Sequence, residues 1–328
     1  MLKIRMVALA LAGFVVVHPS VKGVTFTENF SASPLANGWK IFGDASLFQW
    51  DSTNQNLQVT WDSSKPNTYF HRSLGTILAT NDNLSLGFDL RLSDIAIGVD
   101  TNKPFTFQIA VGFLNFAQAT NATFIRGSGF EAPNLIEFDY FPDSGFGNTI
   151  STPMVSTNNG YASGGFTVGP ELTPNDLFHV EMNYFASNQT LKTIMTKNGA
   201  TFGPIEDTIL GTNFSDFRVD SIAVASYSDA GQDPNFAGSI LAHGVVDNFI
   251  ITVPASPIVN LAGEFSGRSP QVQFNARSNW TYVLERTTDF QYWTNVSPAL
   301  AGTETRLILQ DTNAIVEKAF YRVRADRP

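Results

Sequence analysis

The chain has 328 residues, a formal net charge of −9 at pH 7 and no cysteine. The absence of cysteine excludes disulfides, thiol catalysis and cysteine-ligated zinc, so a hydrophobic core has to supply the stability. The acidic charge argues against nucleic acid or an anionic membrane as a partner, and it is compatible with neutral or cation-assisted ligands.

The N-terminus has the pattern of an export signal. Lys3 and Arg5 precede an apolar run from Val7 to Val17, and a polar segment then ends at Gly23. The run is too short to cross a bilayer, which takes about 20 residues. We therefore predict a signal peptide at residues 1–23 and a secreted protein that is extracellular, periplasmic or held on the cell surface, without membrane insertion. An uncleaved membrane anchor is the alternative.

Charge and proline placement divide the remaining chain in two. Residues 24–254 carry nine basic and 22 acidic side chains, whereas residues 255–328 carry eight basic and seven acidic ones. Pro254, Ser256 and Pro257 mark a linker between these parts. We predict one acidic domain over 24–254 and a small β-module with its own core over 255–328.

Most segments after Val24 alternate with a period of two and are interrupted by turn residues, which predicts an all-β, antiparallel β-sandwich. Trp50 and Trp61 are predicted to pack in the core on two strands joined by a hairpin. A long strand with one buried face is expected over 83–95, a central strand with two apolar faces over 105–116, and a hairpin over 178–199. We interpret His71 as a sheet or edge residue that is hydrogen-bonded locally.

The stretch NLIEFDYFPDSGFGN, residues 134–148, concentrates oxygen-bearing side chains next to a turn. On a strand, Glu137 and Asp139 share one face with their Cα atoms about 6.5–7 Å apart. Beyond Pro142 the chain turns through Asp143, and Asn148 can fold back toward the same point. The spacing suits either a hard cation or an acid pair. The alternative is a solvent-facing acidic pair with no ligand.

A second candidate ligand site lies in the loop SDAGQDPNFAGS. Asp229, Asp233 and Asn235 offer oxygens there for a cation or another ligand. The alternative is a solvated loop tip.

The order of motifs resembles the concanavalin-like jelly roll, and most closely the legume kind of L-type lectin. FQIAVGFL, LIEFDYFPD, HVEMNYFASNQTLKTIMTKNG and VDSIAVASYSD follow one another as the family's strands do, over roughly residues 24–253. The resemblance implies that Glu137, Asp139, Asp143 and Asn148 are metal ligands, with Phe141 contributing its backbone carbonyl. An all-oxygen set of this kind suits Ca²⁺.

The chain departs from that family at two places. ISTPMV holds no histidine for the family's transition-metal site, and NKPFTFQ holds no acid where the family has its sugar-holding aspartate. The resemblance therefore implies a binding scaffold more than a particular specificity. The tail, with TYVLERTTDFQYWTNV and AFYRVRA, is similar to fibronectin type III-like modules of secreted bacterial proteins, which suggests a spacer, attachment or sorting role.

Three functions stay open. The first is a non-catalytic, lectin-like protein that binds a glycan or polysaccharide, with or without Ca²⁺. The second is an enzyme on the same fold, either a glycoside hydrolase, whose second glutamate is replaced here by Phe141 and Pro142, or a polysaccharide lyase that uses His179, Tyr184 and Lys192. The third is an adhesive or structural surface protein. We expect the first, and the sequence leaves the oligomeric state open.

Overall fold

A computed structural model describes residues 23–97, 109–124, 132–142, 147–165, 167–226, 240–267, 269–313 and 318–328. The described chain forms two compact units, Gly23–Ser256 and Pro257–Pro328. The division falls within the Pro-marked segment, two residues beyond Pro254. Within these ranges no helix is long and apolar enough to cross a membrane.

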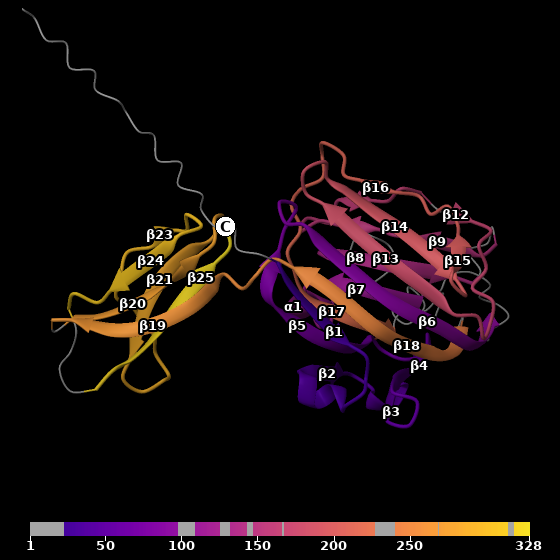
Figure 1. The fold of residues 1–328 in the computed structure, drawn as a ribbon, viewed down its shortest axis with the longest axis horizontal. Helices are drawn as coiled ribbons and strands as arrows, with labels where there is room; N and C mark the ends of the chain where they lie inside the picture. Colours follow the sequence, from indigo (N-terminus) through magenta and orange to yellow (C-terminus); the bar gives the residue numbers. More distant parts are fainter. Residues whose placement is uncertain are drawn as a thin grey trace, which may run out of the picture. The chain divides into compact units, whose positions relative to one another are not determined.

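Two antiparallel sheets make up the first unit (Figure 1). Sheet A has nine strands among the described residues, in the order β15-β14-β13-β6-β18-β4-β3, with β1 beside β18 and β16 beside β14. Their bounds are β1 (Val24–Glu28), β3 (Phe48–Asp51), β4 (Asn56–Asp62), β6 (Leu84–Ile97), β13 (Phe178–Phe185), β14 (Thr190–Lys197), β15 (Ala200–Phe202), β16 (Thr208–Ile209) and β18 (Ile240–Val253).

Sheet B also has nine strands within the described ranges, in the order β11-β10-β8-β7-β17-β5-β2, with β9 pairing both β8 and β12. Their bounds are β2 (Trp39–Phe42), β5 (Thr68–Leu78), β7 (Ile109–Leu114), β8 (Leu135–Phe141), β9 (Thr149–Ser151), β10 (Met154–Val155), β11 (Tyr161–Ala162), β12 (Thr167–Val168) and β17 (Val219–Ser226). The short helices of this unit are η1 (Pro34–Asn37), η2 (Ala45–Leu47) and α1 (Phe116–Ala119).

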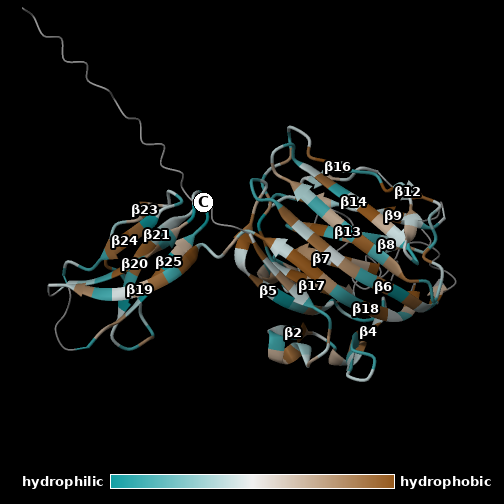
Figure 2. Ribbon diagram, viewed as in Figure 1, coloured by the Kyte–Doolittle hydropathy of each residue, from teal (hydrophilic) through white to brown (hydrophobic). Residues whose placement is uncertain are grey.

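The core of this unit lies between the inner faces of the two sheets. Phe88 of sheet A and Phe138 of sheet B meet edge to face, with ring centroids 5.8 Å apart, and Phe88 also stacks on Phe249. Each fully buried side chain of this size contributes about 1.5–3 kcal/mol. The alternation that creates this layer is visible as hydrophobic and hydrophilic bands along the strands (Figure 2). The predicted antiparallel β-sandwich is confirmed.

Most predicted elements form as expected. β7 is buried on both faces, and β13 pairs with β14 in a hairpin from Phe178 opposite Lys197. Trp61 is buried, and Trp50 packs against the core while its Nε1 donates to the Phe30 carbonyl at 2.9 Å. Both tryptophans therefore have the packing role predicted for them.

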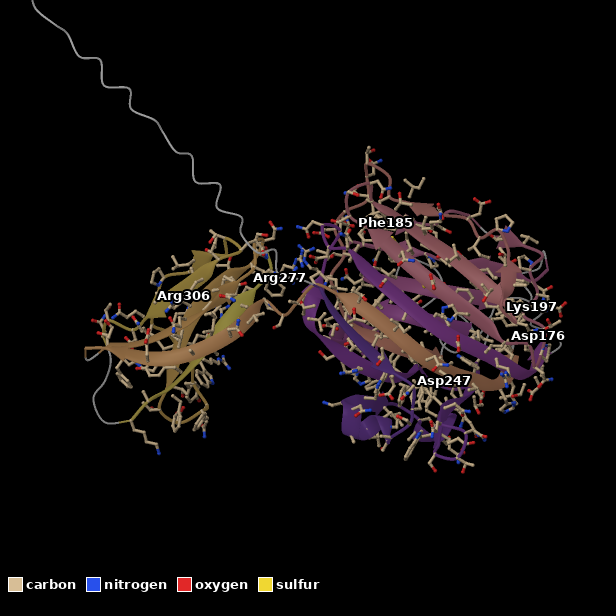
Figure 3. All side chains as sticks on the ribbon, in the orientation of Figure 1. Asp176, Phe185, Lys197, Asp247, Arg277 and Arg306 are labelled. Carbon is tan, nitrogen blue, oxygen red and sulfur yellow. The ribbon has the colours of Figure 1, made fainter. Side chains whose placement is uncertain are left out.

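The segment before β13 is tied to the end of β14. Lys197 Nζ lies 2.7 Å from Asp176 Oδ2, and Asn198 Nδ2 donates to Asp176 Oδ1 (Figure 3). These partners, Lys197 first, hold the pKa of the Asp176 carboxyl well below its usual range. The ion pair fixes where the connection enters sheet A.

The second unit contains two small sheets. Tyr282 packs against Phe274, with centroids 5.0 Å apart, while the buried Glu285 accepts from Arg322 and Arg324. The unit therefore has an interior of its own, and its fibronectin type III-like identity stays a prediction. The strands are β19 (Ile258–Ser266), β20 (Ser269–Ala276) and β24 (Arg306–Gln310) in one sheet, and β21 (Thr281–Thr287), β22 (Thr294–Asn295), β23 (Leu300–Ala301) and β25 (Phe320–Asp326) in the other.

Candidate functional site

The outer face of sheet B, turned away from sheet A, carries a row of side chains that crosses five strands. From β2 to β8 the residues in register are Lys40, His71, Ala223, Gly112 and Glu137. Residues directly opposite on paired strands share a face, so His71 and Glu137 face the same side. They are three strands apart, which places their Cα atoms about 14 Å from each other.

A second row runs parallel to the first, two residues along each strand. Its members, from β2 to β9, are Phe42, Tyr69, Ala225, Ala110, Asp139 and Ser151. In both rows the middle strands β17 and β7 carry only alanine or glycine. The two rows therefore form a floor of small residues, with His71 and Tyr69 on one side and the carboxylates of Glu137 and Asp139 on the other.

Gly112 is required by the close approach of β8, whose backbone leaves no room for a Cβ. A Cβ at this position would lie 2.2 Å from the Ile136 carbonyl oxygen and 2.9 Å from Glu137 Cγ. Any larger residue would push Glu137 off the floor. This glycine thus accounts for the close approach of Glu137 to β7 within an otherwise apolar strand.

Helix α1 lies over the floor and is fastened to it by polar contacts. Asn115 caps the helix by accepting from the Gln118 amide, and Asp220 accepts from the Phe116 amide at 3.0 Å. On the floor side, the Tyr69 hydroxyl donates to the Ala119 carbonyl at 3.0 Å. The helix therefore buries the central alanines and leaves Lys40 and Phe42 exposed at the rim.

His71 is an uncharged side chain at neutral pH. Its ring stacks on Phe116 with centroids 3.9 Å apart, and burial, followed by the charge of Lys40, lowers its pKa to about 4. Its Nδ1 has no hydrogen-bond partner among the residues that the structure describes. His71 is a sheet residue, as one of the two predicted alternatives has it, because it lies on β5 between β2 and β17. Within the described ranges, the predicted local hydrogen bond is absent at Nδ1, where Phe116 of α1 covers the ring.

Glu137 and Asp139 share the outer face, as the sequence predicts, but neither faces solvent. Each is only 1% exposed. The alternative of a solvent-facing acidic pair is therefore wrong. Burying two carboxylates is costly unless they are compensated by hydrogen bonds or opposite charge.

The predicted calcium ligands are only partly gathered. Asn148 directs its Nδ2 to the hydroxyl of Tyr140 at 3.1 Å, and Tyr140 belongs to the inner core. Neighbouring residues on a strand point to opposite faces, so this contact draws the Asn148 amide away from Glu137 and Asp139. Within the described ranges, no three His, Cys, Asp or Glu residues gather as a metal site. Two carboxylates and the Phe141 carbonyl are fewer than the six to eight oxygens that Ca²⁺ takes.

Other predicted site residues lie outside the described ranges. These are Asp143, Asp229, Asp233 and Asn235. The grouping of His179, Tyr184 and Lys192 for lyase chemistry is wrong, because Tyr184 is buried in the core and its hydroxyl donates to the Thr80 carbonyl at 2.8 Å.

The row partners of Glu137 were missed from the sequence. Gly112 was the available signal, since a lone glycine in an apolar strand marks a close approach of another group. No sequence signal connects Lys40 or His71 with Glu137, because β2 pairs with β5, and β5 is linked to β8 only through β17 and β7.

Comparison with known protein families and with curated proteins finds no match for this sequence. Solved structures are similar to the chain. A peanut lectin with a nine-residue peptide is 12% identical with a TM-score of 0.48, covering 71% of this chain and 97% of that one. A Lotus tetragonolobus seed lectin is 11% identical with a TM-score of 0.45, covering 70% and 98%. A PL-14 alginate lyase from Aplysia kurodai is 9% identical with a TM-score of 0.47, covering 71% and 99%.

These likenesses concern the fold and bear on neither ligand nor reaction. The strand pairing of sheets A and B makes the first unit an antiparallel β-sandwich.

Proposed function

We propose that the protein binds carbohydrate without cleaving it and that the outer face of sheet B, around Glu137 and Asp139, is the binding region. The observation that carries this proposal is the pair of rows, in which buried carboxylates face an uncharged imidazole across a floor of small residues. Lys40 and Phe42, at the exposed rim of this face, would contact the ligand. The Lys40 ammonium donates to sugar hydroxyls, and the apolar face of a sugar ring packs on the Phe42 ring.

Binding is favoured over catalysis by the residue at position 141. A retaining glycoside hydrolase needs two carboxyls about 5–5.5 Å apart, one as nucleophile and one as acid/base. Phe141 stands where the related hydrolase motif continues with glutamate, and the core position of Tyr184 removes the phenol from the candidate lyase group. The hydrolase alternative is tested by the same variants as the binding proposal.

Calcium is proposed as the ion that would complete this region. Glu137, Asp139 and the Phe141 carbonyl would supply part of its shell, and Asp143 lies on the same turn in the sequence. We also propose that the predicted signal peptide directs the protein out of the cell, where it would encounter polysaccharides.

The test is a glycan array probed with the full chain in Ca²⁺ and, in parallel, in chelator. Glu137→Gln and Asp139→Asn are the test variants, and Glu206→Gln, which changes an exposed acid away from this face, is the matched control. We expect binding that chelator and Asp139→Asn both weaken at least tenfold, while the control binds like the wild type.

A thermal-unfolding series checks the ion separately. Ca²⁺ should raise the Tm of the wild type, and Asp139→Asn should remove that rise. An unchanged Tm of the wild type in Ca²⁺ would refute the calcium proposal. The absence of binding to any glycan on the arrays would refute carbohydrate binding. New reducing ends that Glu137→Gln abolishes would replace binding by hydrolysis.

A further inference from the structure

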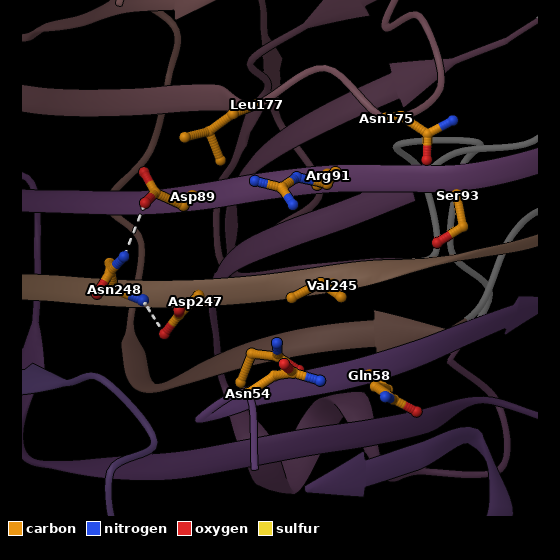
Figure 4. Close-up of a pocket in the computed structure, with 11 residues that line it drawn as sticks. Asn54, Gln58, Asp89, Arg91, Ser93, Asn175, Leu177, Val245, Asp247 and Asn248 are labelled. Carbon is orange, nitrogen blue, oxygen red and sulfur yellow. Dashed lines mark hydrogen bonds between the residues drawn. The ribbon is translucent and has the colours of Figure 1, made fainter. Parts of the chain in front are cut away.

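The outer face of sheet A carries a polar groove of about 570 Å³, which lies within the size range of small-molecule sites (Figure 4). Strands β4, β6 and β18 form it, together with the turn before β4 and the segment before β13. We call it the sheet A groove. Its lining residues are Asn54, Asn56, Gln58, Asp89, Arg91, Ser93, Asn175, Leu177, Val245, Asp247 and Asn248.

The registers of three strands explain why these side chains meet. Arg91, Val245 and Gln58 are in register across β6, β18 and β4, so Val245 forms an apolar centre between a guanidinium and an amide. Asp89 and Asp247 are opposite each other in the next row. The result is a ring of hydrogen-bonding groups around an apolar floor.

One wall of the sheet A groove is held rigidly. Asp89 Oδ1 lies 2.6 Å from His179 Nδ1, and Asp89 Oδ2 accepts from Asn248 Nδ2 at 2.8 Å. Asn248 adopts φ 52° in a bulge of β18, and its backbone amide donates to Asp247 Oδ1 at 2.7 Å. Two of these contacts appear in Figure 4. The wall is therefore organised before a ligand arrives, which lowers the entropic cost of binding.

On the other side of the groove, several side chains keep hydrogen-bonding groups that are not used within the protein. Within the described ranges the Arg91 guanidinium makes no hydrogen bond or ion pair, although it stands in the groove. Asn56 Oδ1 is buried without a partner there. Gln58 Nε2 donates to Asp51 Oδ2 at 3.0 Å, which orients the amide and leaves its oxygen as an acceptor. The buried Asn56 acceptor is unfavourable without a partner, and a polar ligand would satisfy it and also accept from the exposed Arg91 guanidinium.

We propose that the sheet A groove binds a neutral oligosaccharide without a metal ion. This inference takes its ligand class from the proposed function and adds a second site on the opposite sheet. Carboxylate, guanidinium and amide groups match sugar hydroxyls, and Val245 and Leu177 offer an apolar surface to a ring. The two carboxylates repel a polyanion, and within the described ranges no cluster of metal-binding side chains is present here.

The groove continues beyond one sugar unit. A second hollow of about 270 Å³ shares Gln58, Ser93 and Val245 with it and extends along β4 and β18 toward Gln49 and His243. A linear chain can lie across both, whereas a single sugar would fill only one. This continuity favours an oligosaccharide over a monosaccharide.

The test is isothermal titration calorimetry of the full chain, in chelator at pH 7.5, with short gluco-, manno-, galacto- and xylo-oligosaccharides. An oligouronate serves as the anionic comparison. Arg91→Ala and Gln58→Ala change exposed groove side chains, and Asn188→Ala, an exposed residue of the β13–β14 turn outside the groove, is the matched control. We expect one neutral series to bind, and each groove variant to weaken it by roughly tenfold or more while the control keeps wild-type affinity.

Three results would overturn the inference: no neutral oligosaccharide binds in chelator, binding is unchanged in both groove variants, or the oligouronate binds more tightly than every neutral series. The sheet B proposal and the sheet A groove proposal can be refuted independently of each other. Binding lost in Asp139→Asn but kept in Arg91→Ala would leave the sheet B proposal standing and end this one. Chelator-resistant binding lost in Arg91→Ala but kept in Asp139→Asn would support this inference, and the sheet B proposal would then rest on the array in Ca²⁺.

Discussion

The Asp247→Asn substitution is expected to stabilise the protein at neutral pH. Burial, and then the nearby carboxylates of Asp89 and Glu28, raise the pKa of Asp247 from its usual 3.8 to about 6, against the opposing hydrogen bond from the Asn248 amide. A carboxyl whose pKa is higher in the folded state contributes stability that is present below pH 3.8 and is lost as the pH rises through about 6. Above that pH the folded protein bears the cost of holding the charge.

The size of the gain follows from the shift. A rise of about two units corresponds to a ceiling of about 3 kcal/mol. Asp247 is only half-buried, and solvent screens much of the repulsion, so we expect about 1 kcal/mol. The asparagine oxygen can still accept from the Asn248 amide, which keeps the bulge intact.

Chemical denaturation at several pH values measures this effect. We expect Asp247→Asn to exceed the wild type by about 1 kcal/mol at pH 7.5, with the difference shrinking toward zero by pH 4. Asp207→Asn, on an exposed loop, should show no such trend. A difference between Asp247→Asn and wild type that stays constant from pH 4 to pH 7.5 would refute the electrostatic reasoning.

Two further substitutions test the sheet B face. Gly112→Ala should destabilise the protein by about 1–3 kcal/mol or more in denaturant unfolding, because the new Cβ meets the Ile136 carbonyl at 2.2 Å. A loss of stability below about 0.5 kcal/mol, as at an ordinary surface position, would show that Glu137 can move aside. His71→Phe should keep its stability at acidic pH better than the wild type. The pKa of His71 falls from 6.5 to about 4 on folding, so the wild type loses up to about 3 kcal/mol of folding stability as the pH falls from 6.5 to 4. Parallel stability curves of the two proteins between pH 7 and pH 4 would contradict this assignment.

Part of the candidate site follows from local sequence alone. Alternation in LIEFDYF puts Glu137 and Asp139 on one face of a strand whatever the strand pairs with. Their burial could not be predicted, because it depends on which segments the tertiary structure brings over that face; α1, for example, is fastened over β5 and β17 by Tyr69 and Asp220.

The sheet A groove was beyond prediction for the same reason. Arg91, Val245 and Gln58 are far apart in the chain, and only the pairing of β6 with β18 and of β18 with β4 brings them into one row. In sequence they are ordinary outward-facing strand residues.

The sequence by itself determined the fold class, the long strands and the β13–β14 hairpin, because the period of two and the turn residues act locally. Only the tertiary structure decided which residues share a site, because register between distant strands is a property of the whole sandwich and not of any single segment. His71 and Glu137 illustrate this division: each is placed on its own strand by local pattern, and they become members of one row only when three strand pairings are made.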